Sequence, residues 1–379
     1  MKFSINKNTI LEELTNVSRA ISAKNIIPIL NGIKFELGKE GLLLTASDSN
    51  LTIRSLIPRD KIESIESEGI IIITSKILLD IIRKMPTNII NFEVIDDFKI
   101  AIYSGNSESD NYRNYSLNCL NSMDYPEIDF DDSKNHINIK SSKLKEMINQ
   151  TIFAISDQPS RPLLTGLNIK INGNCLECVA TDSYRLAKKN INLEETYDDS
   201  VNIVVPGNNI NELSKILSDD DSNVEIHIYP KKIMFKFKNL AFQSNLLNGE
   251  YPNTSNFIPT EFTHIVTANL KNLYDTIDGA ALLTLGKEKN IVKMDLSNNE
   301  LIVSSYSSET GKAENKLTVK RNVTEPVSIS YSAKYMLEAL NSFNEEEVVL
   351  FMNTDSKPIV IKNIKDESLI QLILPIKTY

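Results

Sequence analysis

The feature that most constrains the fold of this 379-residue chain is a pattern that occurs three times along it. Each copy opens with apolar residues at helical spacing, at residues 10–21, 144–155 and 270–281. A period of 3.6 residues is typical of a helix that buries one face, so we expect a helix at the start of each copy. A chain that repeats itself in this way is expected to consist of three related units.

A strand that runs directly into a second helix is the next recurring element. It is predicted at residues 70–82, 202–214 and 327–340, with junctions at Ser75, Gly207 and Ser332. These junction residues are small and suit helix N-caps.

A pair of strands joined by a turn lies between the two helices of each copy. Residues 42–54 and 176–186 carry this pair, with Asp48 and Asp182 at the turns, and a weaker third copy begins at Leu301. Alternation of apolar and polar residues along these segments is typical of antiparallel sheets with one solvated face.

The joints between the copies also repeat, as Asp124-Tyr125-Pro126 and Glu250-Tyr251-Pro252. Proline restricts the residue before it and cannot donate a ladder hydrogen bond, so we expect extended linkers there. The predicted repeats are therefore residues 1–126, 127–256 and 257–379. Each is an α+β domain of ordinary size with two helices packed on antiparallel sheets.

Composition excludes several classes of protein. The chain has 41 Lys and Arg against 50 Asp and Glu, a net charge of -9, and acidic residues exceed basic ones in every repeat. It should not bind nucleic acid or an anionic membrane by bulk attraction. Three cysteines fit a reducing compartment, and we find neither a signal peptide nor an apolar run approaching the ~18 residues of a membrane span. We expect a cytoplasmic protein without a membrane partner.

No arrangement of residues predicts catalysis. Cys175 and Cys178 form a CxxC, but a strand places residues i and i+3 on opposite faces, and no second pair completes a zinc site. Phosphate-binding loops and metalloprotease motifs are also missing from the sequence. We therefore expect no metal, no cofactor and no enzymatic activity. The three histidines are expected in strands or linkers rather than as catalytic bases: His136, His227 and His264.

Seven segments, in order and over the whole length, resemble the bacterial DNA polymerase III beta subunit family, the sliding clamps. They are Met1-Lys-Phe3, Ile27-Pro-Ile-Leu-Asn31, Ser47-Asp-Ser-Asn-Leu-Thr-Ile53, Arg161-Pro-Leu-Leu-Thr-Gly166, Val179-Ala-Thr-Asp-Ser-Tyr-Arg-Leu186, Gly249-Glu-Tyr-Pro252 and Leu372-Ile-Leu-Pro-Ile-Lys-Thr-Tyr379.

The resemblance implies a DNA-clamp fold and a homodimer in which two chains form a closed six-domain ring around duplex DNA, without sequence specificity. Helices would line the hole, and the ring would tether the replicative polymerase alpha subunit and make it processive. A clamp-loader ATPase would open it. Other polymerases, ligase or mismatch-repair proteins would dock through short linear motifs. Three similar domains per chain fit such a ring, because six units turning about 60° each close a circle.

Basic and polar residues on the helices and nearby loops are the DNA-contact candidates. They are Lys7, Arg19, Lys24, Lys76, Arg83, Lys84, Lys143, Lys145, Gln158, Arg161, Lys215, Lys271 and Lys334. Lys24, Gln158 and Arg161 match contact positions of the family. Pro162 and Leu163 stand where some members have an aromatic pair, which puts stacking on DNA in doubt. Such contacts would reach phosphates and carry no sequence information.

A pocket for partner peptides is implied between the second and third repeats. Its matching positions are Leu164, Thr181, Ser183, Tyr184, Arg185, Leu186, Pro252, Asn256, Phe257, Ser332, Tyr335, Leu372, Leu374, Pro375, Ile376 and Lys377. Apolar walls with a few polar groups suit a short peptide. The alternative for Thr181, Asp182 and Arg185 is a strand-end turn that holds the domain together.

A dimer contact between the first repeat of one chain and the third of the other is implied at apolar or aromatic positions. These are Ile81, Tyr115, Leu117, Leu282 and Leu283. Other interpretations stay open: a duplicate clamp that serves repair polymerases or confers inhibitor resistance, a repeat-built surface protein, three domains without a ring, and, last, an enzyme.

Overall fold

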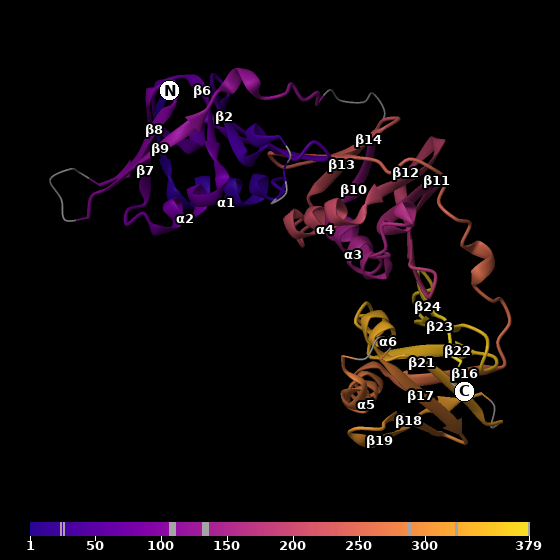
Figure 1. The fold of residues 1–379 in the computed structure, drawn as a ribbon. Helices are drawn as coiled ribbons and strands as arrows, with labels where there is room; N and C mark the ends of the chain where they lie inside the picture. The colour runs from indigo at the N-terminus through magenta and orange to yellow at the C-terminus, as the bar shows by residue number, and fades with distance from the viewer. Residues whose placement is uncertain are drawn as a thin grey trace. The chain divides into compact units, whose positions relative to one another are not determined.

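The computed structural model describes residues 1–22, 25, 27–105, 111–130, 136–286, 290–322 and 325–377. These residues divide into two compact units. Figure 1 labels their helices and strands. Unit 1 comprises residues 1–142 and 215–246, and unit 2 comprises residues 143–214 and 247–379. None of the described helices is long and apolar enough to cross a membrane.

Six α-helices occur in the described chain, two for each predicted repeat. They are α1 (Lys7–Ser18), α2 (Ser75–Lys84), α3 (Ser141–Asn149), α4 (Gly207–Ile216), α5 (Leu270–Ala281) and α6 (Ala333–Leu340). The predicted apolar faces of the helices are buried. In α1, for example, Ile10, Leu14 and Val17 are inaccessible to solvent. The predicted helix at 144–155 ends early, because Thr151 leaves the helical region at φ -128° and only a 3-10 turn follows at Ile152–Ala154.

All strands of unit 1 belong to one sheet. They are β1 (Lys2–Asn6), β2 (Gly32–Gly38), β3 (Gly41–Ser47), β4 (Leu51–Pro58), β5 (Ile62–Ser67), β6 (Gly69–Thr74), β7 (Ile89–Asp96), β8 (Lys99–Ser104), β9 (Arg113–Leu120), β10 (His136–Lys140), β13 (Asn223–Ile228), β14 (Lys232–Phe237) and β15 (Leu240–Asn245). Their order is β10-β13-β14-β15-β4-β3-β2-β6-β9-β8-β7-β1-β5, and the observed pairs are antiparallel. Helix α1 packs on β3 and β4 and against α2.

The described strands of unit 2 form two sheets. Its strands are β11 (Gly166–Thr181), β12 (Arg185–Pro206), β16 (His264–Asn269), β17 (Ile291–Ser297), β18 (Glu300–Ser307), β19 (Gly311–Thr318), β20 (Lys320–Arg321), β21 (Val327–Ser332), β22 (Glu347–Met352), β23 (Ile359–Lys362) and β24 (Leu369–Ile373). One sheet has the order β11-β12-β24-β23-β22-β16-β20 and the other β19-β18-β17-β21. Helix α5 packs on β16 to β19 and against α6.

The division into units runs through the second repeat, and strand pairing explains why. Strand β15, near the end of the second repeat, pairs with β4 of the first. Strand β24, near the end of the third repeat, pairs with β12 of the second. Each repeat junction is thus built into a continuous sheet. The domain limits of 1–126, 127–256 and 257–379 stay a prediction.

The three small residues predicted at the starts of the second helices have different roles. Ser332 is a true N-cap, and its side chain accepts a hydrogen bond from the Tyr335 N–H. Ser75 is already the first helical residue, and Thr74 before it makes no side-chain cap. Gly207 is required by packing: a Cβ there would lie 2.3 Å from Ile155 Cδ1. The N-cap prediction therefore holds only for Ser332.

Candidate partner-binding patch and DNA-facing helices

The turn between β11 and β12 is held by side-chain hydrogen bonds. Asp182 Oδ1 accepts from the backbone N–H groups of Tyr184, at 2.8 Å, and Arg185, at 3.0 Å. Thr181 Oγ1 donates to the Arg185 carbonyl at 2.6 Å and accepts from the Ser183 N–H at 3.1 Å. These bonds stabilise Ser183 at φ 79°, a conformation that non-glycine residues rarely adopt.

The turn between β3 and β4 has the same construction. Asp48 Oδ1 accepts from the N–H groups of Asn50 and Leu51, at 2.9 and 2.8 Å, and Ser49 lies at φ 77°. Ser47 Oγ replaces the threonine hydroxyl and donates to the Leu51 carbonyl at 3.1 Å. The repeat seen in the sequence therefore extends to individual hydrogen bonds, which favours a structural role for Asp182.

An apolar cluster lies where β12 pairs with β24, and four predicted pocket residues belong to it. Leu164, Leu186 and Leu372 are buried within it, and Leu374 packs at its edge. The Leu374 N–H donates to the Tyr184 carbonyl at 2.8 Å, which ties the C-terminal segment to the turn. We call Leu164, Leu186, Leu372 and Leu374 the partner patch.

Four further members of this cluster were missed by the sequence analysis: Val179, Val204, Tyr251 and Val360. Val360 lies on β23, which pairs with β24 opposite Leu372, so a strand predicted at residues 359–362 would have indicated it. Tyr251 leads the linker, and its hydroxyl accepts a hydrogen bond from the Thr181 N–H at 3.1 Å. Burial raises its pKa. The linker is therefore anchored to the sheet rather than loosely extended.

Arg185 is bound within the protein at every part of its guanidinium group. Its Nε donates to Asp182 Oδ2 at 3.1 Å, and its other nitrogens contact a Glu338 carboxylate oxygen and the Phe153 carbonyl. Its Cζ lies 4.3 Å from the centre of the Tyr335 ring, and the residue is 8% exposed. Arg185 thus links β12 to α6, which supports the structural alternative over direct peptide contact.

The other predicted pocket residues surround this core to different degrees. Tyr184 and Phe257 present large exposed side chains, 60% and 52% accessible. Tyr335 is half-buried, and burial together with nearby Asp182 raises its pKa. Exposed residues of the set are Ser183, Pro252, Asn256 and Lys377, half-buried ones are Pro375 and Ile376, and buried ones are Thr181 and Ser332.

Most of the DNA-contact candidates lie on helices and the others on loops, and most of those described are exposed. Exposed members are Lys76, Arg83 and Lys84 of α2, Lys143 of α3, Lys215 of α4, Lys271 of α5 and Lys334 of α6. Lys145 and Arg19 are half-buried. Lys7 is bound internally, since its Nζ donates to the carbonyls of Arg83 and Met85 at 2.8 and 2.7 Å. Lys24 lies outside the described residues.

The loop that carries Gln158 and Arg161 is exposed and adjoins a cleft of about 430 Å³. Asp157, Pro159 and Pro162 line this cleft together with Gly207 at the start of α4. Arg161 Nη1 donates to Ser183 Oγ at 2.8 Å, so the DNA-contact candidate touches the turn beside the partner patch.

The predicted dimer residues lie on one strand edge, in a 3-10 turn and in a helix. Tyr115 and Leu117 are on β9, whose residues 113–118 pair only with β8 among the described strands. Leu282 and Leu283 follow α5 in a 3-10 turn, with Leu282 60% exposed. Ile81 is 7% exposed in α2.

The cysteines and histidines of the described residues form no metal site. No group of three or more His, Cys, Asp or Glu side chains there could hold a metal ion. Cys175 and Cys178 are free thiols on β11, and burial raises the pKa of Cys178 to about 12. The three histidines lie in strands β10, β13 and β16.

Comparisons with known proteins agree with this architecture. Family models of the DNA polymerase III beta subunit match in order: the N-terminal domain at residues 1–129, the central domain at 138–253 and the C-terminal domain at 255–377. The beta sliding clamp of Bacillus subtilis is 37% identical over 384 residues, with both chains covered completely. That of Staphylococcus epidermidis is 33% identical over 386 residues, again with complete coverage.

The chain belongs to the DNA polymerase III beta subunit family, the beta sliding clamps. A crystal structure of the DNA polymerase sliding clamp from Bacillus subtilis superimposes with a TM-score of 0.94 at 36% identity. The beta chain from Streptococcus pneumoniae gives 0.93 at 31% identity, and both comparisons cover each chain fully. The predicted family, clamp fold, replication function and non-catalytic role are thereby confirmed.

Proposed function

We propose that two copies of this chain join head to tail into a ring that encircles duplex DNA and tethers the replicative polymerase. The observation that carries the proposal is full-length membership of the sliding-clamp family in all three domains. Enclosure accounts for the acidic composition, because a ring holds DNA topologically and does not need a strongly basic surface. The cytoplasm remains the predicted location.

Open strand edges supply a means of closing the ring. Strand β9 leaves residues 113–118 unpaired on one side, and β19 pairs only with β18 among the described strands. Antiparallel addition of β19 to the β9 of a second copy would satisfy both rows of backbone groups. Tyr115 and Leu117 of one copy and Leu282 and Leu283 of the other would supply apolar contact, with Ile81 behind them.

Exposed cations of the helices would contact the DNA backbone. Lys76, Lys143, Lys215, Lys271 and Lys334 come from five different helices, so the contacts would be distributed rather than concentrated. Each phosphate contact adds salt-dependent affinity without sequence preference. A small number of weak contacts permits sliding.

The partner patch would receive short linear peptides from the polymerase alpha subunit, the clamp loader, other polymerases, ligase or mismatch-repair proteins. Half-buried Leu374 and the exposed Tyr184 and Phe257 would offer apolar contact, with the buried leucines of the patch packed behind Leu374. A single patch used by many partners implies that they compete for it.

Retention on DNA tests the topological mechanism. The protein, loaded onto circular plasmid by a clamp loader, should remain bound through gel filtration and dissociate once the plasmid is cut to linear form. Equal retention on circular and linear DNA would refute encirclement. A Tyr184→Ala, Leu374→Ala double variant, which changes exposed and half-buried side chains only, should still be retained on circles but should lose stimulation of the polymerase.

A further inference from the structure

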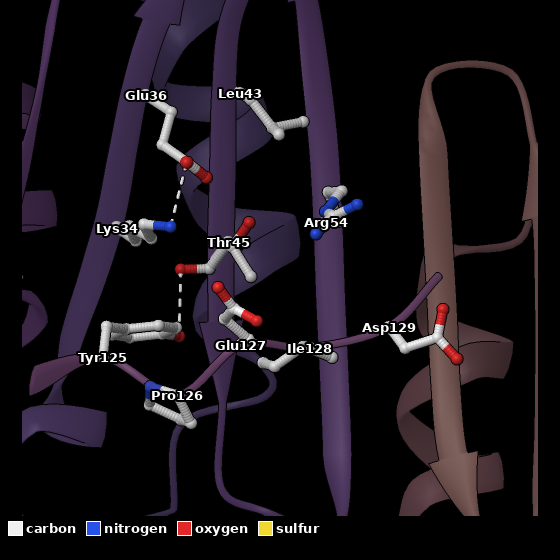
Figure 2. Close-up of a pocket in the computed structure, with 10 residues that line it drawn as sticks. All are labelled: Lys34, Glu36, Leu43, Thr45, Arg54, Tyr125, Pro126, Glu127, Ile128 and Asp129. Atoms are coloured by element: carbon white, nitrogen blue, oxygen red, sulfur yellow. Dashed lines mark hydrogen bonds and ion pairs between the residues drawn. The ribbon is translucent and has the colours of Figure 1, made fainter. Parts of the chain in front are cut away.

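The two repeat junctions share their construction, so the residues that differ between them indicate what distinguishes each junction. In the first, Figure 2 shows strands β2, β3 and β4 side by side, with the segment that begins at Tyr125 crossing in front of them. The Tyr125 hydroxyl donates to the Thr45 carbonyl at 3.4 Å. In the second, the Tyr251 hydroxyl accepts from the Thr181 N–H at 3.1 Å. Each linker tyrosine is thus bound to the strand that leads into a turn.

The turn itself is also attached in the same way in both junctions. The Asn245 N–H donates to the Asn50 carbonyl at 2.8 Å, and the Leu374 N–H donates to the Tyr184 carbonyl at 2.8 Å. Asn50 and Tyr184 are 134 residues apart, which is the offset of the aspartates in the two turns. The first junction therefore has two polar side chains where the second has Tyr184 and Leu374, which belong to the proposed peptide site.

A further difference accompanies this change. Arg161 lies in the loop before β11, and its Nη1 donates to Ser183 Oγ at 2.8 Å. By the same offset, the corresponding residue of the first repeat is Ile27, which is 47% exposed and whose side chain has no donor. Pro28 and Pro162 follow these residues, and each begins a 3-10 turn, so the two loops correspond. Of these two junctions, the one with the proposed peptide site is the one whose turn is held by a cation.

Arg161 retains donors for a second ligand. A guanidinium group presents five N–H donors in one plane. The Nε and Nη2 of Arg161 have no hydrogen-bond partner among the residues that the structure describes, and the residue is exposed. This edge can bind a phosphate through two parallel hydrogen bonds while Nη1 keeps its bond to Ser183.

We propose that Arg161 couples contact with DNA to the turn beside the partner patch. A phosphate on its Nε–Nη2 edge fixes the guanidinium group, which then holds Ser183 and the exposed Tyr184 that follows it. Ser183 lies at φ 79°, and a turn in this rarely adopted conformation gains order from each added hydrogen bond. The inference rests on the proposed function, since it needs DNA inside the ring and a partner at the patch.

The consequence is that a ring on DNA binds its partners more tightly than a free ring. Coupling of this kind is reciprocal, so a bound partner raises the affinity for DNA by the same factor. One hydrogen bond between an exposed arginine and a hydroxyl contributes little free energy, so we expect a factor of about two to five.

The test uses the intact protein, either free or loaded by a clamp loader onto a nicked plasmid that ligase then closes. Hydrogen exchange of the segment 181–186 is measured by mass spectrometry. In the parent, DNA should slow this exchange by about two- to fivefold, whereas in Ser183→Ala and Arg161→Met it should have no effect. The double variant should behave as either single variant, because both substitutions remove the same contact.

Binding of the replicative polymerase alpha subunit gives a second readout, which a purely structural role of Arg161 would not change. Its affinity is measured for free rings and for rings on the closed plasmid, and the ratio of the two is compared between proteins, which cancels direct binding of the alpha subunit to DNA. The ratio should be about two- to fivefold larger for the parent than for Ser183→Ala. Lys271→Met removes a proposed phosphate contact of α5 and should keep the ratio of the parent.

Three outcomes would overturn the proposal. They are unchanged exchange of the segment 181–186 on DNA, faster exchange there, which indicates that a phosphate draws Arg161 away from Ser183, and an equal ratio for the parent and Ser183→Ala. A ratio lowered as much by Lys271→Met also counts against it, because the effect would then not be specific to Arg161. Rings that are retained on circular DNA without these effects refute only the coupling, whereas rings that are not retained refute encirclement and the coupling with it.

Discussion

Arg185 provides a quantitative test of how the second and third repeats are held together. Replacing it with Met keeps an apolar chain over the Tyr335 ring but removes the contacts to Asp182, Glu338 and the Phe153 carbonyl. Breaking a buried ion pair from one side costs about 3 to 5 kcal/mol, because the remaining charge is left in a poorly solvated place.

Two features place the expected value at the lower end of that range. Asp182 keeps two backbone N–H donors, and the side chain of Glu338 is 35% exposed and can be solvated. We therefore expect Arg185→Met to lower the free energy of opening of unit 2 by about 3 kcal/mol, equivalent to roughly a hundredfold increase in the open population.

Hydrogen exchange measured by mass spectrometry is the appropriate assay, since the chain has no tryptophan and two units that need not unfold together. Peptides covering residues 150–156, 181–186 and 333–340 should lose protection, whereas peptides from α1 and β1 to β9 should not change. The control is Arg161→Met, an exposed arginine whose bond to Ser183 should contribute less than about 1 kcal/mol.

A loss below about 1 kcal/mol for Arg185→Met, or one equal to that of the Arg161 variant, would refute this reasoning and return Arg185 to the candidates for peptide contact. Arg185→Lys adds a second check. One ammonium group cannot reproduce the three directions of the guanidinium, so it should restore less than half of the lost stability.

Three further predictions follow from other parts of the chain. Burial and the neighbouring Arg321 charge lower the pKa of His264. Its stabilising contribution is therefore present above about pH 6.5 and is lost as the pH falls through the pKa that it has in the folded protein. His264→Asn should flatten the slope of the free energy of unfolding against pH in this range. Gln371→Leu removes buried hydrogen bonds to a carbonyl and a serine hydroxyl, both at 2.9 Å, and should cost about 2 kcal/mol in urea unfolding. Tyr115→Asp combined with Leu283→Asp should yield monomers in sedimentation; a dimer of unchanged affinity would exclude the proposed strand-edge interface.

The sequence predicted most of the structural features that the three repeats share, and few of the features that distinguish one repeat from another. Helical spacing and the Asp48 and Asp182 turns were readable because local hydrogen bonds and burial of one face determine them. Gly207 was wrongly predicted to be an N-cap. A glycine is needed there because of close contact with Ile155, which lies 52 residues away in the sequence. Contact across such a separation leaves no periodic signal in one sequence.

The same limitation applies to the candidate sites. Arg185 matches a position of the family pocket, but its side chain is bound within the protein by Glu338, which lies 153 residues further along the chain. Val360 was missed because its strand contributes only four residues, too few for a clear alternation.

The two repeat junctions show why one chain would carry one partner patch of this kind. Strand β15 pairs with β4 as β24 pairs with β12, and each junction places a residue of the later repeat opposite one of the earlier. In unit 2 the opposed pair is Leu186 and Leu372, whereas in unit 1 it is Thr52 and Gln243. Both polar residues are buried, and Thr52 is hydrogen-bonded to a serine hydroxyl at 2.8 Å. A polar junction of this kind offers little to an apolar side chain, because an apolar group cannot supply the hydrogen bond that the buried Gln243 Oε1 lacks. The first junction thus keeps the backbone pairing that joins repeats and lacks the apolar residues through which we propose that the second junction binds peptides.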